Sequence, residues 1–289
     1  MKLKENAFKL ITLSAASLSI LFLMGIILSI FQKGVPLFKD IYFSDFIFGR
    51  MWHPTDEPAD LGIFSLIAGS LSVTMGALLV GVPLGVGSAI YLSEIASTNV
   101  REILKPFIEI LAGIPSVIYG LFGMAVLAPF IRKIFNIPTG LNLLSASIIL
   151  GIMIIPIISS LSEDALRAVS KELREASLAL GANRIETIFK VVLPAASSGV
   201  IASVILGFGR AMGETMVVLM VSGGAAMVPK SIFSPVRPMT SAIASEMGEA
   251  VNGSQHFQAL YSIAIVLFLV TLLSSLLMQR FSQRSRMHE

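Results

Sequence analysis

Long uncharged, apolar stretches alternate with short charged segments along the whole chain. Six of these stretches are long enough to cross a membrane as helices, which takes about 20 apolar residues. They lie at roughly 10–31, 62–92, 106–130, 141–161, 195–222 and 256–279. The first is too long for the apolar core of a secretory signal peptide, and no clear small-residue cleavage site follows it. The pattern therefore predicts an all-α, polytopic membrane protein with six transmembrane helices.

The composition agrees with a membrane protein and excludes several other classes. Of the 289 residues, 55% are hydrophobic and only 13% are charged, against roughly a quarter in soluble proteins. This excludes disorder and disfavours a water-soluble enzyme. The absence of cysteine excludes disulfides and thiolate sites. The three histidines are scattered, so we expect no metal site, and the basic residues are divided among loops, so we expect no nucleic-acid binding.

The distribution of Lys and Arg predicts an orientation in the membrane. The segments on the side of the termini hold 13 of these residues and the segments on the other side hold 7. Cytoplasmic loops carry the excess of basic residues, so both termini are predicted to be cytoplasmic. We expect three parts: an N-terminal helix and outer loop at 1–61, a transmembrane core at 62–280, and a basic cytoplasmic tail at 281–289.

Proline interrupts several of the apolar stretches. Pro83, Pro115 and Pro156 all lie inside predicted spans, and Gly residues accompany the first two. Proline removes a backbone donor and bends a helix, and in lipid the freed carbonyls must be satisfied by protein or water. Any single break is explained by packing alone. Together they favour a multi-helix transporter over a simple membrane anchor.

The loop between the fourth and fifth spans, at 162–194, has the pattern of a helical hairpin. Apolar residues recur every three or four positions and predict one apolar stripe on a first helix; they are Leu166, Val169, Leu173, Ala176 and Leu180. Gly181 is expected to end this helix, and Asn183 with Glu186 fits a capping box that starts a second one. The second helix presents Ile185, Ile188, Phe189 and Val192. Such a face either packs on the chain's own helices or receives a partner.

The same loop carries a motif with long, fixed spacing. Glu175, Ala176 and Ser177 are followed after three residues by Gly181, and after nine more by 191–194, which ends in Leu193 and Pro194. This resembles the EAA loop of ABC-transporter permeases, with Ser177 in place of Ala and Val191 in place of Ile. The resemblance implies a MetI-like type I ABC importer permease fold. It also implies that these residues dock into a groove on a cytoplasmic ATPase.

Two charges fall within the fifth span, at Arg210 and Glu214. A charge at membrane depth costs about 2.5–3.5 kcal/mol on insertion scales. Four residues apart on a helix, the two side chains would share one face and pair. The pair is either a structural lock between helices or an anion-handling site, because Arg offers a fork of donors for phosphate oxygens. Glu214 could accept a hydrogen bond from a protonated oxyanion and disfavour sulfate. Glu109, at the start of the third span, is interpreted as structural.

The segment from Arg210 through Glu214 to Thr215 also resembles the Arg-Ala-x-Gly-Glu-Thr signature of phosphate-specific (Pst-type) ABC permeases. Further similarity covers roughly 60–280, and residues 82–94 and 111–130 favour the C-type over the A-type subunit. The resemblance implies that Arg210, Glu214 and Thr215 line the substrate path. It implies three partners: a homologous A-type permease in a heterodimer, two copies of a cytoplasmic ATPase, and an extracytoplasmic phosphate-binding protein. The location implied is the bacterial cytoplasmic (inner) membrane.

The chain itself lacks a Walker-type phosphate-binding loop, so ATP is expected to bind the partner ATPase and the chain is not expected to be an enzyme or to need a cofactor. Two other functions stay open at this point. One is a permease for another oxyanion such as molybdate, sulfate or phosphonate. The other is a membrane scaffold that senses phosphate without moving it, against which the EAA loop argues, because a sensor needs no ATPase dock.

Overall fold

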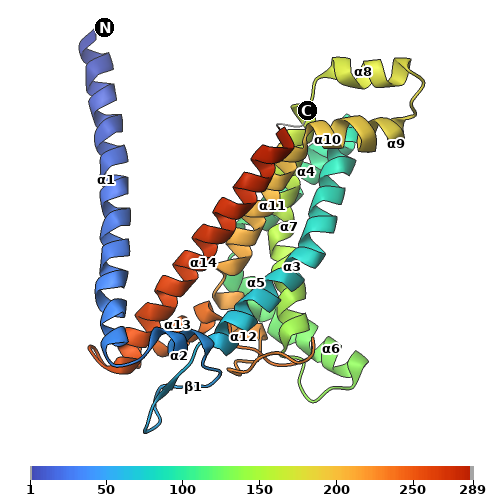
Figure 1. Ribbon diagram of the computed structural model, residues 1–289. Coiled ribbons are helices and arrows are strands. Elements are labelled where there is room, and N and C mark those ends of the chain that lie inside the picture. Colours follow the sequence, from blue (N-terminus) through green and yellow to red (C-terminus); the bar gives the residue numbers. More distant parts are fainter. Residues whose placement is uncertain (1, 287–289) are drawn as a thin grey trace.

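The computed structural model describes the backbone of residues 2–286 and the side chains of 8–277 and 279–280. The described chain is mostly helical (Figure 1). Its first part contains α1 (Lys2–Gly34), η1 (Val35–Lys39), α2 (Phe43–Phe48), β1 (Trp52–His53), β2 (Asp60–Leu61), α3 (Phe64–Ile90), η2 (Tyr91–Ile95), α4 (Thr98–Gly113), α5 (Ser116–Phe122), η3 (Gly123–Leu127) and α6 (Ala128–Phe135). Its second part contains α7 (Leu143–Arg167), α8 (Lys171–Ala179), α9 (Arg184–Thr187), η4 (Ile188–Val192), α10 (Leu193–Ala195), α11 (Ser197–Met212), α12 (Met216–Val221), α13 (Met239–Glu246) and α14 (Gln255–Arg286).

Five helical stretches of the described chain are long and apolar enough to cross a membrane, and a bent pair makes a sixth if it is counted as one span. The five are Phe8–Lys39, Phe64–Ile95, Ser116–Phe135, Leu143–Arg167 and Gln255–Leu277. The bent pair joins Arg184–Ala195 to Ser197–Met212 at an angle of 70°. The predicted multi-pass, all-α architecture is confirmed, and the first, second, fourth and sixth predicted spans match closely.

Two predicted spans differ from the structure. The third was expected at 106–130, but the chain leaves the helix at Ile114, where the backbone is extended before Pro115. The residue before a proline avoids helical geometry, so α4 is a separate helix and the span begins at Ser116. The fifth was expected as one helix over 195–222, but it ends at Met212 and a short new helix begins at Met216.

Helices α3 and α7 form the centre of the molecule because small residues let them approach closely. A Cβ atom at Gly85 would lie 2.8 Å from the Ile158 side chain of α7, and one at Gly151 would lie 2.8 Å from the Val80 side chain of α3. Such contacts leave no room for larger residues and favour tight helix pairing in membranes. Helix α11 packs on the same pair, with Phe208, Ala211 and Met212 buried.

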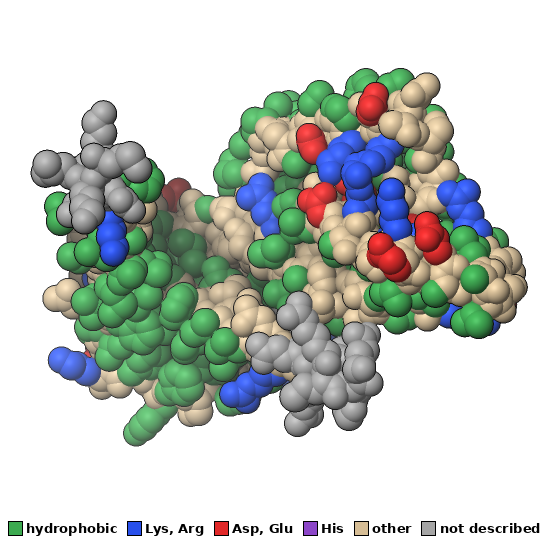
Figure 2. All heavy atoms as spheres, turned by 90° about the horizontal axis from the view of Figure 1, so that it is seen from above, with side chains coloured by type: hydrophobic (Ala, Val, Ile, Leu, Met, Phe, Trp, Pro, Cys, Tyr) green, Lys and Arg blue, Asp and Glu red, His purple; other side chains and the backbone are tan. Residues whose placement is uncertain are grey.

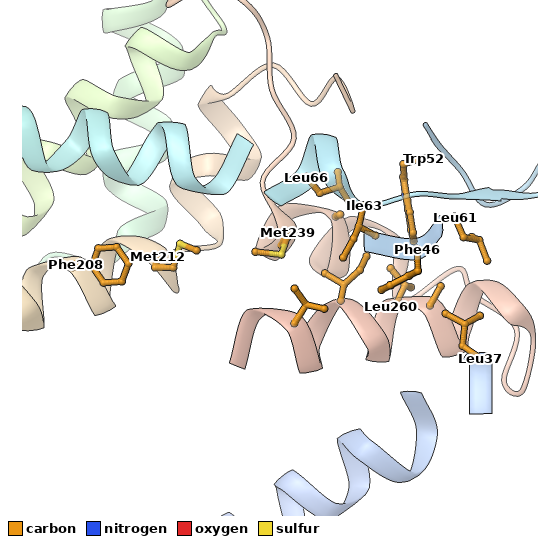
Figure 3. Packing of buried hydrophobic residues seen from close by; sticks show 14 residues of the cluster. Leu37, Phe46, Trp52, Leu61, Ile63, Leu66, Phe208, Met212, Met239 and Leu260 are labelled. Carbon is orange, nitrogen blue, oxygen red and sulfur yellow. The ribbon is translucent and has the colours of Figure 1, made fainter. Parts of the chain in front are cut away.

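A second core lies among β1, α2 and α13, at the end of the molecule opposite the hairpin (Figure 1), and Figure 3 shows its packing. Leu37, Phe46, Trp52 and Ile63 from the segment before α3 pack there on Leu260 of α14. This packing fixes the antiparallel β1–β2 pair against the helices, with Trp52 opposite Leu61. The outer loop of the prediction is therefore a folded segment rather than an open connection.

The two ends of the molecule differ in their side chains. The beginning of α1, the end of α14 and the hairpin formed by α8 and α9 lie at one end, while β1, α2, α6 and α13 lie at the other (Figure 1). Figure 2 looks onto the first end and shows basic and acidic side chains gathered on the side opposite α1. The segments that the basic residues predicted to be cytoplasmic thus share one end, and which compartment this end faces stays a prediction.

Candidate functional site

One face of α11 is not covered by the described helices of the chain. Ala202, Leu206 and Arg210 follow one another at intervals of four residues on this face and are exposed. The opposite face is buried against α7, α14 and α3. The side chain of Arg210 is 49% exposed. The structure therefore places this cation on an open surface within an apolar helix, directly beside the point where the helix ends.

The helix breaks at Gly213, Glu214 and Thr215, and Glu214 occupies the break. Its side chain is buried, and Oε1 accepts hydrogen bonds from the backbone nitrogens of Met216 at 3.1 Å and Val217 at 3.4 Å. The first backbone N–H groups of a helix lack partners within it, and a carboxylate there is favourable. Glu214 therefore caps the first turn of α12.

The prediction that Arg210 and Glu214 share one helix face is wrong, because Glu214 lies beyond the end of α11. The two side chains still approach each other, with Nη2 of Arg210 at 4.0 Å from Oε2 of Glu214. The predicted ion pair is thus present at its outer distance limit, and whether it joins helices or handles an anion stays a prediction. Within the described chain Arg210 has no other polar partner. Thr215 stands between the two helices, and its hydroxyl lies 3.5 Å from the carbonyl of Gly213.

The turn of the hairpin has the predicted chemistry. Gly181 follows α8 with φ of +89°, a conformation that favours glycine. The side chain of Asn183 accepts from the nitrogen of Glu186 at 2.9 Å, and the carboxylate of Glu186 accepts from the nitrogen of Asn183 at 3.0 Å. The backbone hydrogen bond from Asn183, with help from Lys190, lowers the pKa of Glu186 below its usual value. The predicted helix end and capping box are both confirmed.

The apolar stripe of the hairpin is divided between two helices rather than lying on one. Helix α7 continues to Arg167, and the Ser170 side chain caps a new helix by accepting from the nitrogen of Leu173 at 3.5 Å. Leu166 is consequently buried within the chain, whereas Leu180 is 90% exposed. The second arm is divided in the same way: Ile188 and Val192 are buried, and Ile185 and Phe189 are exposed. Of the nine predicted stripe residues, three are buried against the chain's own helices, Val169 is partly buried, and the other five are exposed.

The residues of the EAA-like motif lie along both arms of this hairpin. Glu175 and Ala176 are exposed on α8, Leu193 is half-buried and Pro194 is exposed in α10. Ser177, where the motif departs from its usual Ala, is buried, and its hydroxyl lies 2.9 Å from that of Thr187 in α9. The substitution therefore adds a hydrogen bond that joins the two arms.

Two ionic groups at the same end of the molecule were not predicted from the sequence. The carboxylate of Glu163, in α7, is 1% exposed and contacts Arg101 at 3.0 Å and Lys105 at 2.6 Å, both from α4. The hydrogen bond to Glu163 raises the pKa of Lys105. The second group pairs Glu94, at the end of the span that contains α3, with Arg174 of α8. In the sequence, both glutamates directly follow an apolar span and precede segments rich in Lys and Arg, and this pattern could have indicated ion pairs at the ends of the spans.

A further polar group lies at the opposite end. The carboxylate of Glu246 in α13 accepts from Nε1 of Trp52 at 3.0 Å and from Nη1 of Arg237 at 2.5 Å, and it lies 2.9 Å from Nε2 of His256. These contacts join β1, α13 and α14. His256 was not singled out as a site residue, and the structure places it in this structural cluster at the start of α14.

The sequence of the chain is similar to those of known transport proteins. A family model described as "Binding-protein-dependent transport system inner membrane component" matches residues 81–287. The "Probable ABC transporter permease protein YqgH" of Bacillus subtilis is 39% identical over 94% of this chain and 87% of that protein. The "Phosphate transport system permease protein PstC" of Mesorhizobium japonicum is 34% identical over 94% of this chain and 88% of that protein.

Solved structures have the same fold. A chain of a bacterial alginate ABC transporter, solved in complex with an alginate-bound periplasmic protein, superposes with a TM-score of 0.68 at 15% identity, covering 95% of this chain and 94% of that one. A chain of the MetNI methionine ABC transporter in an inward-facing conformation superposes with a TM-score of 0.58 at 21% identity, covering 78% of this chain and 94% of that one. At these identities the likeness concerns the fold.

Proposed function

We infer the function from one premise: the chain belongs to the family of binding-protein-dependent transport system inner membrane components. It is a multi-pass membrane protein with the fold of an ABC importer permease, and it is a transport subunit rather than an enzyme. We propose that it is the C-type permease of an ATP-driven phosphate importer. The names of relatives such as the Mesorhizobium protein support phosphate as the substrate.

The observation that carries the assignment of the substrate path is the state of Arg210. Its guanidinium is half exposed on the open face of α11, and its one contact within the described chain is 4.0 Å long. A cation in an apolar helix without a close partner is costly, and a phosphate anion would satisfy its donors in the geometry that a guanidinium favours. Arg210 is therefore proposed to bind phosphate as it crosses.

Glu214 is proposed to select the protonated form of the anion. Its Oε1 is already engaged by two backbone nitrogens of α12, which leaves Oε2 facing Arg210. A phosphate that carries a proton can donate a hydrogen bond to this free oxygen. A fully ionised sulfate would meet an unpaired carboxylate, and this repulsion discriminates between the two anions. Thr215 lines the same break and offers a hydroxyl.

The hairpin is proposed to be the dock for the ATPase. It projects from the body of the molecule and exposes Leu178, Leu180 and Ile185 beside the EAA-like motif (Figure 1). Exposed apolar surface of this kind marks a contact with another protein.

A homologous A-type permease is proposed to cover the open face of α11 and complete the path. Two ATPase copies would bind ATP and drive the pair, and a phosphate-binding protein would deliver phosphate at the opposite, extracytoplasmic end. The proposed location is the bacterial inner membrane with both termini cytoplasmic.

The experiment is reconstitution of the full assembly in proteoliposomes. The chain is co-expressed with candidate permease and ATPase partners, purified through a tag on this chain, and supplied with the phosphate-binding protein. We expect both partners to co-purify, and labelled phosphate to enter the vesicles only with ATP. Uptake of sulfate or molybdate in place of phosphate would contradict the proposed substrate. The transport function would be contradicted if the purified chain bound the phosphate-loaded binding protein but no ATPase co-purified with it.

A further inference from the structure

The two arms of the hairpin converge on one residue at the end of the α3 span. Glu94 lies in η2, and its side chain is 10% exposed. Arg174 of α8 binds its carboxylate at two points, with Nη2 at 2.7 Å from Oε1 and Nε at 3.3 Å from Oε2. Arg184 of α9 donates to the backbone carbonyl of the same residue. A two-point contact between guanidinium and carboxylate fixes distance and orientation together.

Arg174 also holds the end of α7. Its Nη2 donates to the carbonyl of Leu166 at 2.8 Å, and Nη1 donates to that of Ser170 at 3.2 Å and to that of Val169. The Leu166 carbonyl, near the end of α7, also accepts from the nitrogen of Val169 at 3.3 Å, so Arg174 adds a second donor there and ties the linker that follows to the same guanidinium. One guanidinium therefore joins three segments: η2, which continues α3, the end of α7, and α8.

Helices α3 and α7 behave as one body in this arrangement. They are packed without spare room, as the contacts at Gly85 and Gly151 demonstrate. Displacement of α8 cannot be absorbed between these two helices, because interiors packed this closely transmit strain. The linker between α7 and α8 is only three residues long, at 168–170, and Arg174 bonds to two of its carbonyls. A force on the hairpin is thus passed to both helices.

We propose that Glu94 is the joint through which the hairpin moves α3 and α7 together, with Arg174 and Arg184 as positioning residues that keep the joint closed. This inference rests on the proposed function, because it assumes that an ATPase displaces the hairpin. The three residues touch neither the transported anion nor the ATPase in this role. Their effect is on how much transport each hydrolysed ATP yields.

A purely structural role gives a different result from a role in coupling. Removing one partner of a buried ion pair leaves the other charge without compensation and lowers stability. If the pair only stabilised the chain, its removal would lower the yield of assembled transporter, and the molecules that do assemble would transport normally. The decisive quantity is therefore the number of anions transported per ATP, measured on assembled complex alone.

The experiment compares Glu94→Gln, Arg174→Gln and Arg174→Lys in the complete reconstituted transporter. We expect both glutamine variants to assemble and hydrolyse ATP, with transport per ATP reduced at least about tenfold. Arg174→Lys keeps the charge but not the fork of donors, so an intermediate ratio is expected. Lys190→Gln is the matched control, because it breaks an exposed i,i+4 pair of the same hairpin and should leave the ratio unchanged. Wild-type ratios in both glutamine variants would overturn the proposal.

A distance measurement covers the case in which a variant fails to assemble. The chain has no cysteine, so spin labels placed only at Ile95→Cys and Glu172→Cys report on the joint in an otherwise wild-type complex. We expect the same distance with and without ATP, since the two segments move together. A change in this distance during the cycle would overturn the joint. If the wild-type complex coupled hydrolysis to transport of another anion, the proposed substrate would be wrong but the joint would not. The number of those anions transported per ATP would then test the joint in the same variants.

Discussion

Two arginine–glutamate pairs of similar composition lie in different regions of the molecule and are engaged to very different degrees. Arg174 contacts the Glu94 carboxylate at 2.7 Å and 3.3 Å, and its other donors bond backbone carbonyls at the end of α7 and in the linker to α8. Arg210 approaches Glu214 only to 4.0 Å and is half exposed. A guanidinium with every donor used holds segments together, whereas one with unused donors is available to an incoming anion. The contrast separates the residues proposed to transmit motion from those proposed to meet the substrate.

The largest effect is expected when the unused donors are removed. Arg210→Gln should lower phosphate uptake at least about 100-fold, since loss of a charged hydrogen-bond donor costs about 1.5–3 kcal/mol and the site also loses its positive charge. Assembly with the ATPase should persist, because the side chain makes one long contact within the described chain. The measurement is uptake of labelled phosphate into proteoliposomes.

Arg132→Gln provides the control for this variant, because Arg132 is likewise exposed but lies in α6 at the other end of the molecule. It should transport phosphate normally. If Arg210→Gln transported as well as this control, the open face of α11 would not be the phosphate path, and the contrast between the two pairs would lose its functional meaning.

An intermediate effect is expected at the turn of the hairpin. Gly181→Val places a β-branched residue at φ of +89°, and a left-handed conformation costs roughly 1–2 kcal/mol for such residues. The turn should distort, and transport per ATP should fall by about tenfold, the factor that corresponds to about 1.4 kcal/mol. The measurement is phosphate uptake together with ATP hydrolysis in the same vesicles. Ala182→Val, next to it, has ordinary backbone geometry and should couple normally; equal behaviour of the two variants would exclude the turn as a requirement.

The smallest effect on phosphate uptake is expected at Glu214. In Glu214→Gln the amide oxygen can still accept from the nitrogens of Met216 and Val217, so the cap of α12 should survive. Phosphate uptake should change by no more than about fivefold, which corresponds to about 1 kcal/mol, the usual net contribution of one neutral hydrogen bond. Sulfate should become a better competitor, because the repulsive charge is gone. Competition of sulfate with labelled phosphate measures this, and unchanged selectivity would remove Glu214 from the discrimination.

The sequence predicted those parts of the fold that depend on local composition. Apolar stretches of sufficient length located four spans closely, and the turn at Gly181 and the cap at Asn183 followed from the residues that these conformations require. The break at Glu214 could not be predicted in this way, because its apolar neighbours continue a helical pattern. What ends the helix there is capping of α12 by the Glu214 carboxylate, together with Thr240, whose hydroxyl holds the carbonyl of Glu214 at 2.7 Å.

Some residues of the candidate site could be predicted from the sequence and others could not, for a related reason. Arg210 stands out in any sequence because it is a charge inside an apolar stretch. The contact between Glu94 and Arg174 joins residues that are 80 positions apart, and the carboxylate at Glu163 meets a helix whose separate existence depends on the break before Pro115. Such pairs can be identified only when the positions of the helices relative to one another are known. From the sequence, the basic residues at this end of the molecule could therefore be used only to predict the orientation in the membrane.

The π-helical turn at η2 has a consequence for how Glu94 is aimed. A π turn holds one residue more than an α-helical turn in the same stretch, and this turn carries Glu94 between Tyr91 and Ile95. If the same residues wound as a regular α-helix instead, every later side chain would be rotated by about 100° about the helix axis. The span would remain long enough for the bilayer, yet the carboxylate would face away from Arg174. The direction of one acidic side chain, and with it the attachment of the hairpin, depends on a single surplus residue.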